Sequence, residues 1–296
     1  MLDNVTIGFI GGGVMGEAMT RGVLTKKVVK PKHVIVSDVR EDRVAELTER
    51  YGIRGTRSNC EVAQEVDVLV LAVKPQVISR VLGELRGSVK ATALVLSIAA
   101  GVPIRTIADG LAHAAVVRAM PNTPAQIGQG ITVWTATPQV SAQQLAQTET
   151  ILGAFGEHVQ VDDESYLDMA TALSGTGPAY VFLFMEALVD AGVHLGFSRH
   201  VAEKLVLQTM RGAVEYAAQA GRHLATLRNQ VTSPGGTSAE AIYHLEKGGL
   251  RTVISRAVWA AYQRSVALGG GAAPGARLGG RSPEGDQFSG NNAPSK

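Results

Sequence analysis

The sequence predicts an α/β domain built on a parallel sheet, followed by an all-helical domain. Strand-like runs alternate with helical stretches up to about residue 161, and from about residue 162 the pattern is almost entirely helical. A glycine-rich motif directly after the first strand-like run indicates a dinucleotide-binding domain. We therefore expect two domains, over residues 1–161 and 162–268, and a disordered tail over residues 269–296.

Seven strand-like runs define the first domain. Helical stretches such as Glu41–Tyr51 and Gln76–Leu85 separate them, and strands that alternate with helices form a parallel sheet covered on both faces. Ser58 and Glu61 have the spacing of a capping box, which predicts a helix start. The expected strands are Val5–Ile10, His33–Asp38, Asp67–Val73, Ala93–Ile98, Ala115–Ala119, Gly130–Ala136 and His158–Val161.

The first strand leads into a glycine motif with G-x-G-x-x-G spacing, and a helix is expected from Glu17. Gly11 permits the tight turn, Gly13 lets the backbone approach a pyrophosphate, and Gly16 lets helix and strand pack closely. The helix N-terminus offers N–H groups and a positive dipole end to the anion. This strand–turn–helix context predicts a Rossmann-type domain that binds NADP or NAD. The expected binding residues are Gly11, Gly12, Gly13, Val14, Met15 and Gly16.

The end of the second strand bears on the choice between the two cofactors. Asp38 lies about 20 positions after the glycines, where an acidic residue binds the ribose 2′-OH of NAD. Asp38 and Glu41 also have the spacing of an N-cap and N3 pair for the next helix. Arg40 and Arg43 lie where the 2′-phosphate of NADP could be met. These interpretations oppose each other, so the residues alone leave both cofactors open.

Three later strands end in loops at the same edge of the sheet, where ligands of open parallel sheets bind. Lys74 could meet a cofactor phosphate or ribose, and Asn122 could orient the nicotinamide amide or a substrate group. A tight connection without a ligand is the alternative for each loop, but the shared edge favours a cofactor site. The expected cofactor residues here are Ala72, Val73, Lys74, Pro75, Ala99, Ala100 and Asn122.

Two glycine-containing segments interrupt the helical pattern of the second domain. In Ala172–Tyr180 the helical pattern restarts at Pro178, which suits a first helical turn, and Ser233–Ser238 precedes a helix expected over Ala239–Glu246. Free N–H groups, a helix dipole and hydroxyl groups make an anion pocket that suits a substrate carboxylate. Ordinary N-capping by Thr237 or Ser238 is the alternative, but two adjacent glycines exceed what a cap needs.

The stretch Ala179–Leu195 is almost continuously apolar. A helix that is apolar all round must be buried on most sides, and a small helical domain has little interior for it. We therefore expect it in a homodimer interface, with a central core helix of a monomer as the alternative. Residues 269–296 are rich in Gly, Pro, Ser and Asn and cannot bury enough surface to offset their ordering entropy, which predicts a disordered tail.

Composition narrows the classes of function. Hydrophobic residues make up 45% of the chain, the net charge is +2, and the basic residues are dispersed, so we expect a packed core and no nucleic-acid binding. A single cysteine, Cys60, fits a reducing compartment, and we expect a cytoplasmic protein without a membrane span. Motifs for metal or nucleophilic catalysis are missing from the sequence, so we expect no metal and favour hydride transfer, whose difficult step the cofactor carries.

Over about residues 5–268, these motifs together resemble the pyrroline-5-carboxylate reductase family. The segment before the helix at Ala239 is the most specific of them, and all occur in the family's order. The resemblance rests on Gly11–Gly16, Ala72–Pro75, Ala99–Gly101, Met120–Pro124, Ser174–Tyr180 and Ser233–Ser238.

The resemblance implies NAD(P)H-dependent reduction of 1-pyrroline-5-carboxylate to L-proline, the last step of proline biosynthesis. It implies a helical domain that interleaves in a homodimer, with rings of dimers known in the family and the active site near the dimer interface. Ser238 would hydrogen-bond the ring nitrogen, and Asn59 would lie near the NADP ribose. Asp38 departs from the small or neutral residues usual at its position. The implied substrate site comprises Ser233, Gly235, Gly236, Thr237 and Thr176.

Two other functions remain compatible with the first domain. A reductase of the hydroxyacid or 6-phosphogluconate type would carry a catalytic lysine with a nearby asparagine in its helical domain, and no such motif surrounds Lys204. A protein that only senses NAD(P) would bind the cofactor but lack the Ser233–Ser238 pocket. Oxidation of NAD(P)H with pyrroline-5-carboxylate or with 2-keto acids separates the three.

Overall fold

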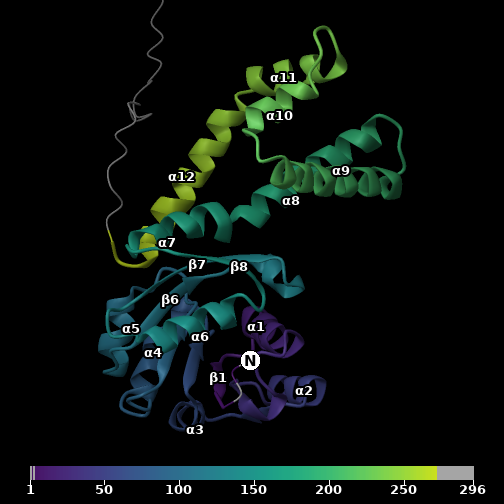
Figure 1. Cartoon of the computed structure of the whole chain (residues 1–296). Coiled ribbons are helices and arrows are strands. Elements are labelled where there is room, and N and C mark those ends of the chain that lie inside the picture. The colour runs from purple at the N-terminus through teal and green to yellow at the C-terminus, as the bar shows by residue number, and fades with distance from the viewer. Residues whose placement is uncertain (1, 3, 272–296) are drawn as a thin grey trace, which may run out of the picture.

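The computed structural model describes residue 2 and residues 4–271. An eight-stranded sheet with helices on both faces forms one domain, and long helices project from one edge of it (Figure 1). This confirms the predicted fold class of a Rossmann-type α/β domain followed by an all-helical domain. The strands are β1 (Ile7–Ile10), β2 (Val34–Ser37), β3 (Arg54–Thr56), β4 (Val68–Leu71), β5 (Leu94–Ser97), β6 (Val116–Met120), β7 (Gly130–Ala136) and β8 (Gly156–Gln160).

The strands lie in the order β3-β2-β1-β4-β5-β6-β7-β8. Strands β1, β2, β4 and β5 are buried along their whole length, as expected for apolar strands covered on both faces. The helices α1, α2 and α6 cover one face, and α3, α4 and α5 cover the other. They are α1 (Val14–Thr25), α2 (Glu41–Tyr51), α3 (Asn59–Glu65), α4 (Pro75–Leu85), α5 (Ile104–Leu111) and α6 (Ala142–Leu152), with 3-10 turns η1 (Pro31–His33) and η2 (Thr123–Ile127).

The sheet departs from the sequence prediction in two places. Strand β3 was not predicted, because it has three largely exposed residues at the sheet edge and no apolar run. Strand β7 pairs antiparallel with β6, and β8 then pairs parallel with β7, so the sheet is not wholly parallel. The link between β6 and β7 holds only the short turn η2, and a parallel crossover needs a dozen or more residues.

Two helix starts also differ in detail. Ser58 Oγ accepts from the N–H of Glu61 at 3.3 Å, but the Glu61 carboxylate accepts from Thr56 Oγ1 at 2.6 Å, which leaves only half of the predicted capping box. Helix α2 begins at Glu41 with Arg40 as its N-cap, so the predicted N-cap role of Asp38 is wrong. Asp38 instead faces the glycine loop.

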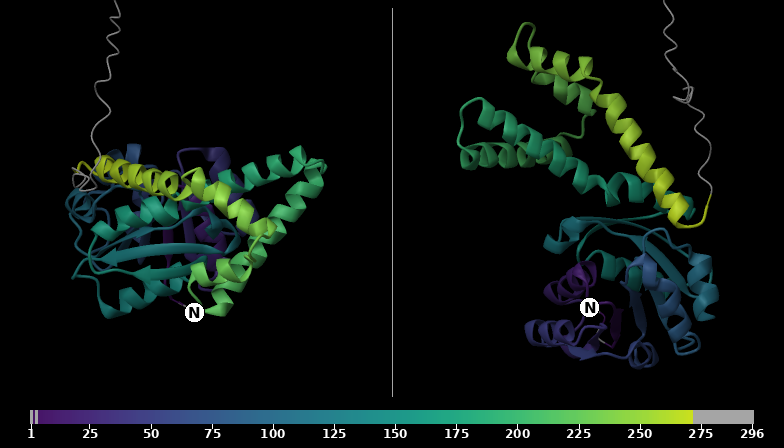
Figure 2. Two further views of the ribbon diagram at one scale, coloured as in Figure 1. Left: turned by 90° about the horizontal axis from the view of Figure 1, so that it is seen from above. Right: turned by 180° about the vertical axis from the view of Figure 1, so that it is seen from behind.

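The helical domain is an arm with two legs that start at one joint beside the sheet (Figure 2). One leg leaves through α7 and α8, and the other returns through α12, whose end packs on α7 and the turn that follows it, while α7 itself contacts β6 and β7 (Figure 1). The helices are α7 (Ser165–Ala170), α8 (Gly177–His194), α9 (Arg199–Ala220), α10 (Leu224–Gln230), α11 (Thr237–Lys247) and α12 (Leu250–Leu268).

The glycines of Ser174–Tyr180 do not break the chain out of helical structure, contrary to the prediction. The π-helical turn η3 (Thr171–Gly175) joins α7 to α8 instead, and a proline sits in the first turn of α8 as expected. The continuous stretch Ser165–His194 is long and apolar enough to cross a membrane by length and composition alone, although no span was predicted. An apolar surface of this kind is also typical of a helix that packs against another protein subunit.

The arm exposes most of its large apolar side chains. Within α8, only Val189 is buried, whereas Phe182 is 62% and Leu183 67% exposed. The alternative of a monomer core helix is therefore wrong for this protomer. The predicted disordered tail begins at Gly269, and residues 272–296 of it lie outside the described part of the chain.

Candidate functional site

The glycine loop lies at the carboxyl end of β1, between the parallel strands β2 and β4, where the order of strands along the sheet changes direction. Gly11 has φ +102°, a backbone angle that residues other than glycine rarely adopt. A Cβ on Gly16 would collide with the carbonyl oxygen of Gly11, so helix and strand pack closely, as predicted. A Cβ on Gly13 would meet no atom within 4 Å. Packing within the protein therefore does not require glycine at 13, which fits a backbone left open to a ligand.

A groove in two parts runs past this loop. The outer pocket has a volume of about 590 Å³ and lies between the ends of β1, β2 and β4. The inner pocket, of about 410 Å³, lies between the glycine loop, the end of β6 and the π-helical turn. Both pockets are lined by Gly13, Ala72, Val73 and Lys74. The predicted segment Ala72–Lys74 therefore forms a wall that the two pockets share.

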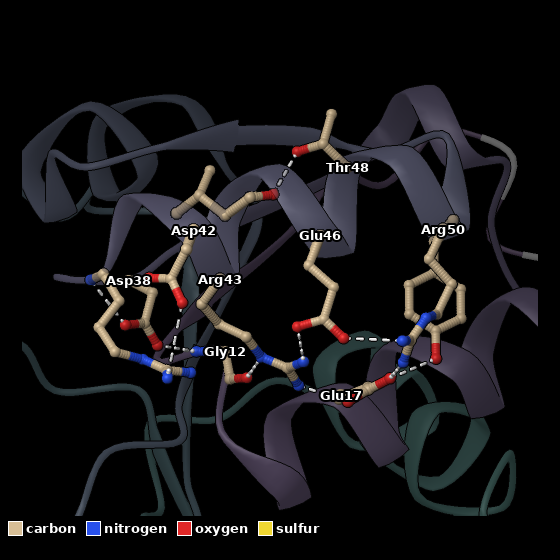
Figure 3. A network of polar contacts seen from close by, with 11 residues as sticks. Gly12, Glu17, Asp38, Asp42, Arg43, Glu46, Thr48 and Arg50 are labelled. Carbon is tan, nitrogen blue, oxygen red and sulfur yellow. Dashed lines mark hydrogen bonds and ion pairs between the residues drawn. The ribbon is translucent and has the colours of Figure 1, made fainter.

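The peptide of Gly12 is held from both sides, as Figure 3 shows. Its N–H donates to Asp38 Oδ2 at 2.9 Å, and its carbonyl accepts from Arg43 Nε at 2.7 Å. Asp38 Oδ1 also accepts from the N–H of Arg40 at 3.0 Å. The carboxylate of Asp38 thus has a structural use in shaping the loop, in addition to any contact with a ribose.

Arg43 does not reach toward a cofactor phosphate, contrary to the expectation. Its guanidinium is buried and pairs with Glu17 and with Glu46 at 2.6 Å (Figure 3). Burial alone would raise the pKa of Glu17, but hydrogen bonds from Arg43, Tyr51 and Arg50 outweigh it and lower that pKa to about 2. Glu17 is therefore ionised at neutral pH and fixes Arg43 against the loop.

Cations gather in the outer pocket beyond Asp38. Arg40, which the sequence predicted, lines it together with Arg57 and Arg80, which were missed. Arg57 stands two residues before the predicted residue Asn59, and that spacing was the available signal, whereas no predicted residue pointed to Arg80. Asn59 lines the same pocket, and its side chain bonds Ser37 Oγ at 2.7 Å and Glu84 Oε2 at 3.0 Å. Guanidinium groups around such a pocket suit a phosphate.

The inner pocket brings the end of β6 against the second domain. Its lining includes Met120, Asn122 and Gly175. The buried side chain of Asn122 donates from Nδ2 to the carbonyl of Ser174 at 3.1 Å and accepts at Oδ1 from the N–H of Ile131 at 3.0 Å. Asn122 thus ties the loop to the π-helical turn, and contact with a nicotinamide stays a prediction for it. Thr176, the N-cap of α8, follows directly.

Three predicted residues contribute less directly. Ala99 and Ala100 do not line either part of the groove among the described residues, although Ile98 does. The loop instead packs against the last helix, α12. A Cβ on Gly101 would lie only 3.0 Å from Leu268 Cβ, which shows how closely the two approach. Pro75 is in the first turn of α4, with Lys74 as its N-cap. Val14 and Met15 line the inner pocket as expected.

The segment Ser233–Ser238 forms a tight turn into α11. Gly236, rather than a hydroxyl residue, is the N-cap, and no side chain caps the helix. Gly235 has φ +72°, and the N–H of Gly236 donates to Ser233 O at 3.0 Å. Capping by Thr237 or Ser238 is therefore not the role of these hydroxyls, and no side chain accepts from the first N–H groups of α11. This segment lies near the tip of the arm, far from β1 and the glycine loop of the same protomer (Figure 1).

A dinucleotide groove at the switch point of a Rossmann-type sheet, with a helical domain after it, defines an NAD(P)-dependent oxidoreductase. The family model for pyrroline-5-carboxylate reductase dimerisation matches residues 164–268, and a model described as NADP oxidoreductase, coenzyme F420-dependent, matches residues 6–101.

Full-length relatives agree with these matches. The pyrroline-5-carboxylate reductase of Synechocystis is 44% identical over 90% of this chain and 99% of its own length. The solved structure of the Coxiella burnetii enzyme is 39% identical, with a TM-score of 0.83 over 89% of this chain and 98% of that one. The Plasmodium falciparum enzyme, solved with NADP bound, is 32% identical, with a TM-score of 0.82 over 90% and 98%. This chain belongs to the pyrroline-5-carboxylate reductase family.

Proposed function

We propose that this protein reduces 1-pyrroline-5-carboxylate to L-proline with NADPH. The observation that carries the proposal is the start of α11, where Gly236 caps the helix and the hydroxyls of Thr237 and Ser238 are not used for capping. N–H groups at a helix start, with hydroxyls beside them, suit a substrate that carries a carboxylate and a ring nitrogen. Family membership supports the same substrate.

The residues would divide the work on the substrate. The N–H groups around Gly236 and Thr237 hold the carboxylate, and the Ser238 hydroxyl hydrogen-bonds the imine nitrogen. NADPH, when bound, supplies a hydride to the imine carbon. The electron pair of the C=N double bond then stays on nitrogen, which also carries the added proton, so the product is the secondary amine. By holding the protonated nitrogen, Ser238 favours the electrophilic form of the imine and can pass a proton.

A homodimer would complete the site. The Ser233–Ser238 segment lies far from the glycine loop of its own protomer, so the helix start and the groove do not meet within one chain (Figure 1). The exposed apolar side chains of α8, such as Phe182 and Leu183, give the surface that a second copy would cover. We infer that the arm of one protomer carries its helix start to the inner pocket of its partner. Assembly of dimers into rings stays a prediction.

The outer pocket supports NADP as the cofactor. Arg40, Arg57 and Arg80 line it, and the carboxylate of Asp38 already accepts two backbone N–H groups. These observations support an interaction of the arginines with the 2′-phosphate of NADP over one of Asp38 with the ribose of NAD. The open backbone at Gly13 and the start of α1 fit the pyrophosphate.

Steady-state assays of Ser238 variants test the proposal. Oxidation of NADPH, compared with NADH, is followed with pyrroline-5-carboxylate and with 2-keto acids. Ser238→Ala should lower kcat by about 10²–10³-fold, because a hydrogen bond to the reacting group is lost. Ser238→Thr, the matched control, keeps a hydroxyl and should retain most activity, and NADPH affinity should not change in either variant. Full activity of Ser238→Ala would remove Ser238 from the mechanism, and turnover of 2-keto acids alone would overturn the proposed substrate.

A further inference from the structure

A buried arginine lies at the joint between the sheet and the arm. Arg118 is in the middle of β6 and is only 4% exposed. Its Nη1 pairs with Glu164 Oε1 at 2.7 Å and its Nη2 with Asp168 Oδ1 at 3.3 Å. Glu164 is the N-cap of α7 and Asp168 lies in the first turn of that helix. One guanidinium therefore holds the start of the outgoing leg of the arm.

The returning leg is tied to the same group. Ser265, which is buried near the end of α12, donates from Oγ to Asp168 Oδ1 at 2.8 Å. Asp168 thus links Arg118 on the sheet to Ser265 on α12, which lies 97 positions after Asp168 in the chain. Both legs of the arm, which diverge away from the sheet in Figure 2, converge on this one side chain.

The joint also contacts the segment between β5 and α5, and it lies close in sequence to the end of β6 in the inner pocket. Glu164 Oε1 accepts the N–H of Ile104 at 2.7 Å, just after the loop that contains Gly101. Gly101 in turn packs against Leu268 at the end of α12. Two residues beyond Arg118, the chain reaches Met120 in the inner pocket. The arm is therefore fixed to backbone that leads directly into the inner pocket.

The ion pairs of this cluster suit the orientation of the arm better than they suit stabilisation of the fold. Buried ion pairs add little net stability compared with apolar packing, since desolvation of the charges offsets their attraction. A planar guanidinium that forks to two carboxylates does, however, impose a fixed geometry on them. Small angular changes at the joint become large displacements at the tip of a long arm.

We propose that Arg118 is a positioning residue for the reduction: it sets the direction of the arm and so places Ser238 of one protomer over the inner pocket of its partner. This inference rests on the proposed function. Arg118 itself touches neither substrate nor cofactor. Its loss should therefore impair use of the imine and leave NADPH binding intact.

Kinetics of joint variants test the proposal. Arg118→Met should lower kcat/KM for pyrroline-5-carboxylate by about 10–100-fold, because displacements of about 1 Å cost that much in rate. Its NADPH dissociation constant should stay within about two-fold of the native value, since the outer pocket is remote from the joint. The kcat/KM of Arg118→Lys should lie between those of the native protein and Arg118→Met, because an ammonium group keeps the charge but cannot fork to both carboxylates. The matched control is Arg105→Met, which removes an exposed pair with Asp109 on α5 and should change nothing.

Ser265→Ala is the second variant, for the case in which Arg118→Met does not fold. It releases only the returning leg and should lower kcat/KM for the imine by about 2–10-fold, the value of one hydrogen bond. The proposal is overturned if a folded, dimeric Arg118→Met, or failing that Ser265→Ala, keeps native kcat/KM for the imine. It is equally overturned if NADPH affinity falls in step with kcat/KM.

An activity-independent readout separates this proposal from the proposed function. Amide hydrogen exchange in Ser265→Ala should be faster in α7 and at the end of α12 than in the native protein, and unchanged in α2. If the native protein does not reduce the imine, the proposed function fails, while exchange still reports on the joint. Unchanged exchange at α7 and α12 would show that Ser265 and Asp168 do not hold the arm.

Discussion

The sheet domain and the arm bury their apolar residues in opposite ways. In the sheet domain, every residue of β1, β2, β4 and β5 is buried, and helices close both faces. In the arm, α11 has no buried residue, and α8 and α9 have one each. The sheet domain is thus complete within one chain, whereas the arm gives its apolar side chains no interior.

This difference divides the function between the two regions. The two pockets where we propose that the dinucleotide binds are formed within one protomer, so cofactor binding should survive separation of the subunits. The helix start proposed to hold the substrate is carried by the arm, so reduction should not. Predictions that separate cofactor binding from turnover therefore test the comparison directly.

The largest effect is expected from a charge on the exposed face of α8. Phe182→Lys places an ammonium group where we infer the partner subunit, and two-fold symmetry introduces it twice. The dimer dissociation constant should rise by about 10⁴-fold, or roughly 5.5 kcal/mol, because an unpaired buried charge replaces an apolar contact. Sedimentation velocity should show monomers, and imine reduction should be lost while NADPH still binds.

Ala146→Lys is the matched control, since it adds the same charge to an exposed position of α6 in the sheet domain. It should leave both assembly and turnover unchanged. An active monomer of Phe182→Lys would contradict the division of function, because the site would then be complete within one chain.

The sheet domain could be predicted in detail because its elements follow from local sequence. Helix α2 has the predicted bounds Glu41–Tyr51, and β7 has the predicted bounds Gly130–Ala136. Strand β3 was missed because it owes its pairing to β2 and not to an apolar pattern of its own. The reversed direction of β7 follows from a short connection, which strand propensity does not report.

The site was predictable in its residue types and less so in their partners. Glycine spacing located the groove, because Gly11 and Gly16 answer local steric needs of the turn, whereas Gly13 leaves the backbone open beside the two pockets. The burial of Arg43 beneath the loop was not foreseen, since it depends on Glu17, which is distant in sequence and meets it only in the folded chain. The same holds for the joint, where residues from β6, α7 and α12 come together.

The second prediction concerns a glycine whose requirement comes from the ligand. Gly13→Val should raise the dissociation constant of NADPH by about 100-fold or more, or roughly 2.7 kcal/mol, because a branched side chain would occupy the space of the pyrophosphate. Gly13 has φ −67°, which valine can adopt, and its Cβ would meet no protein atom, so folding should be preserved. Titration of protein fluorescence measures the affinity, and thermal unfolding measures the stability.

Gly16→Val supplies the opposite case within the same loop. Its Cβ would collide with the carbonyl of Gly11, so this variant should lose about 1–3 kcal/mol of stability through overpacking. Native NADPH affinity in Gly13→Val would refute the assignment of the glycine loop to the cofactor.

The smallest expected effect is a dependence of sheet-domain stability on acid. The folded-state pKa of Glu17 is about 2, below its ordinary value of 4.5, so its pairing stabilises the fold above about pH 4.5 and is lost as the pH falls toward 2. Glu17→Gln should lower the free energy of unfolding by roughly 1–2 kcal/mol at neutral pH and flatten its decline in acid. Urea unfolding followed by fluorescence of the buried Trp134, in a Trp259→Phe background, measures this domain alone.

Asp190→Asn is the control in the arm, where Asp190 pairs with Arg199 at 2.8 Å and both side chains are more than half exposed. An exposed pair contributes at most about 1 kcal/mol, and this one lies outside the sheet domain, so the Trp134 transition should not move. Acid sensitivity that persists unchanged in Glu17→Gln would mean that other carboxylates govern it. If instead the sensitivity disappears only in Glu17→Gln, the ions beneath the glycine loop stabilise the sheet domain without any contribution from the arm, as the contrast between the two regions requires.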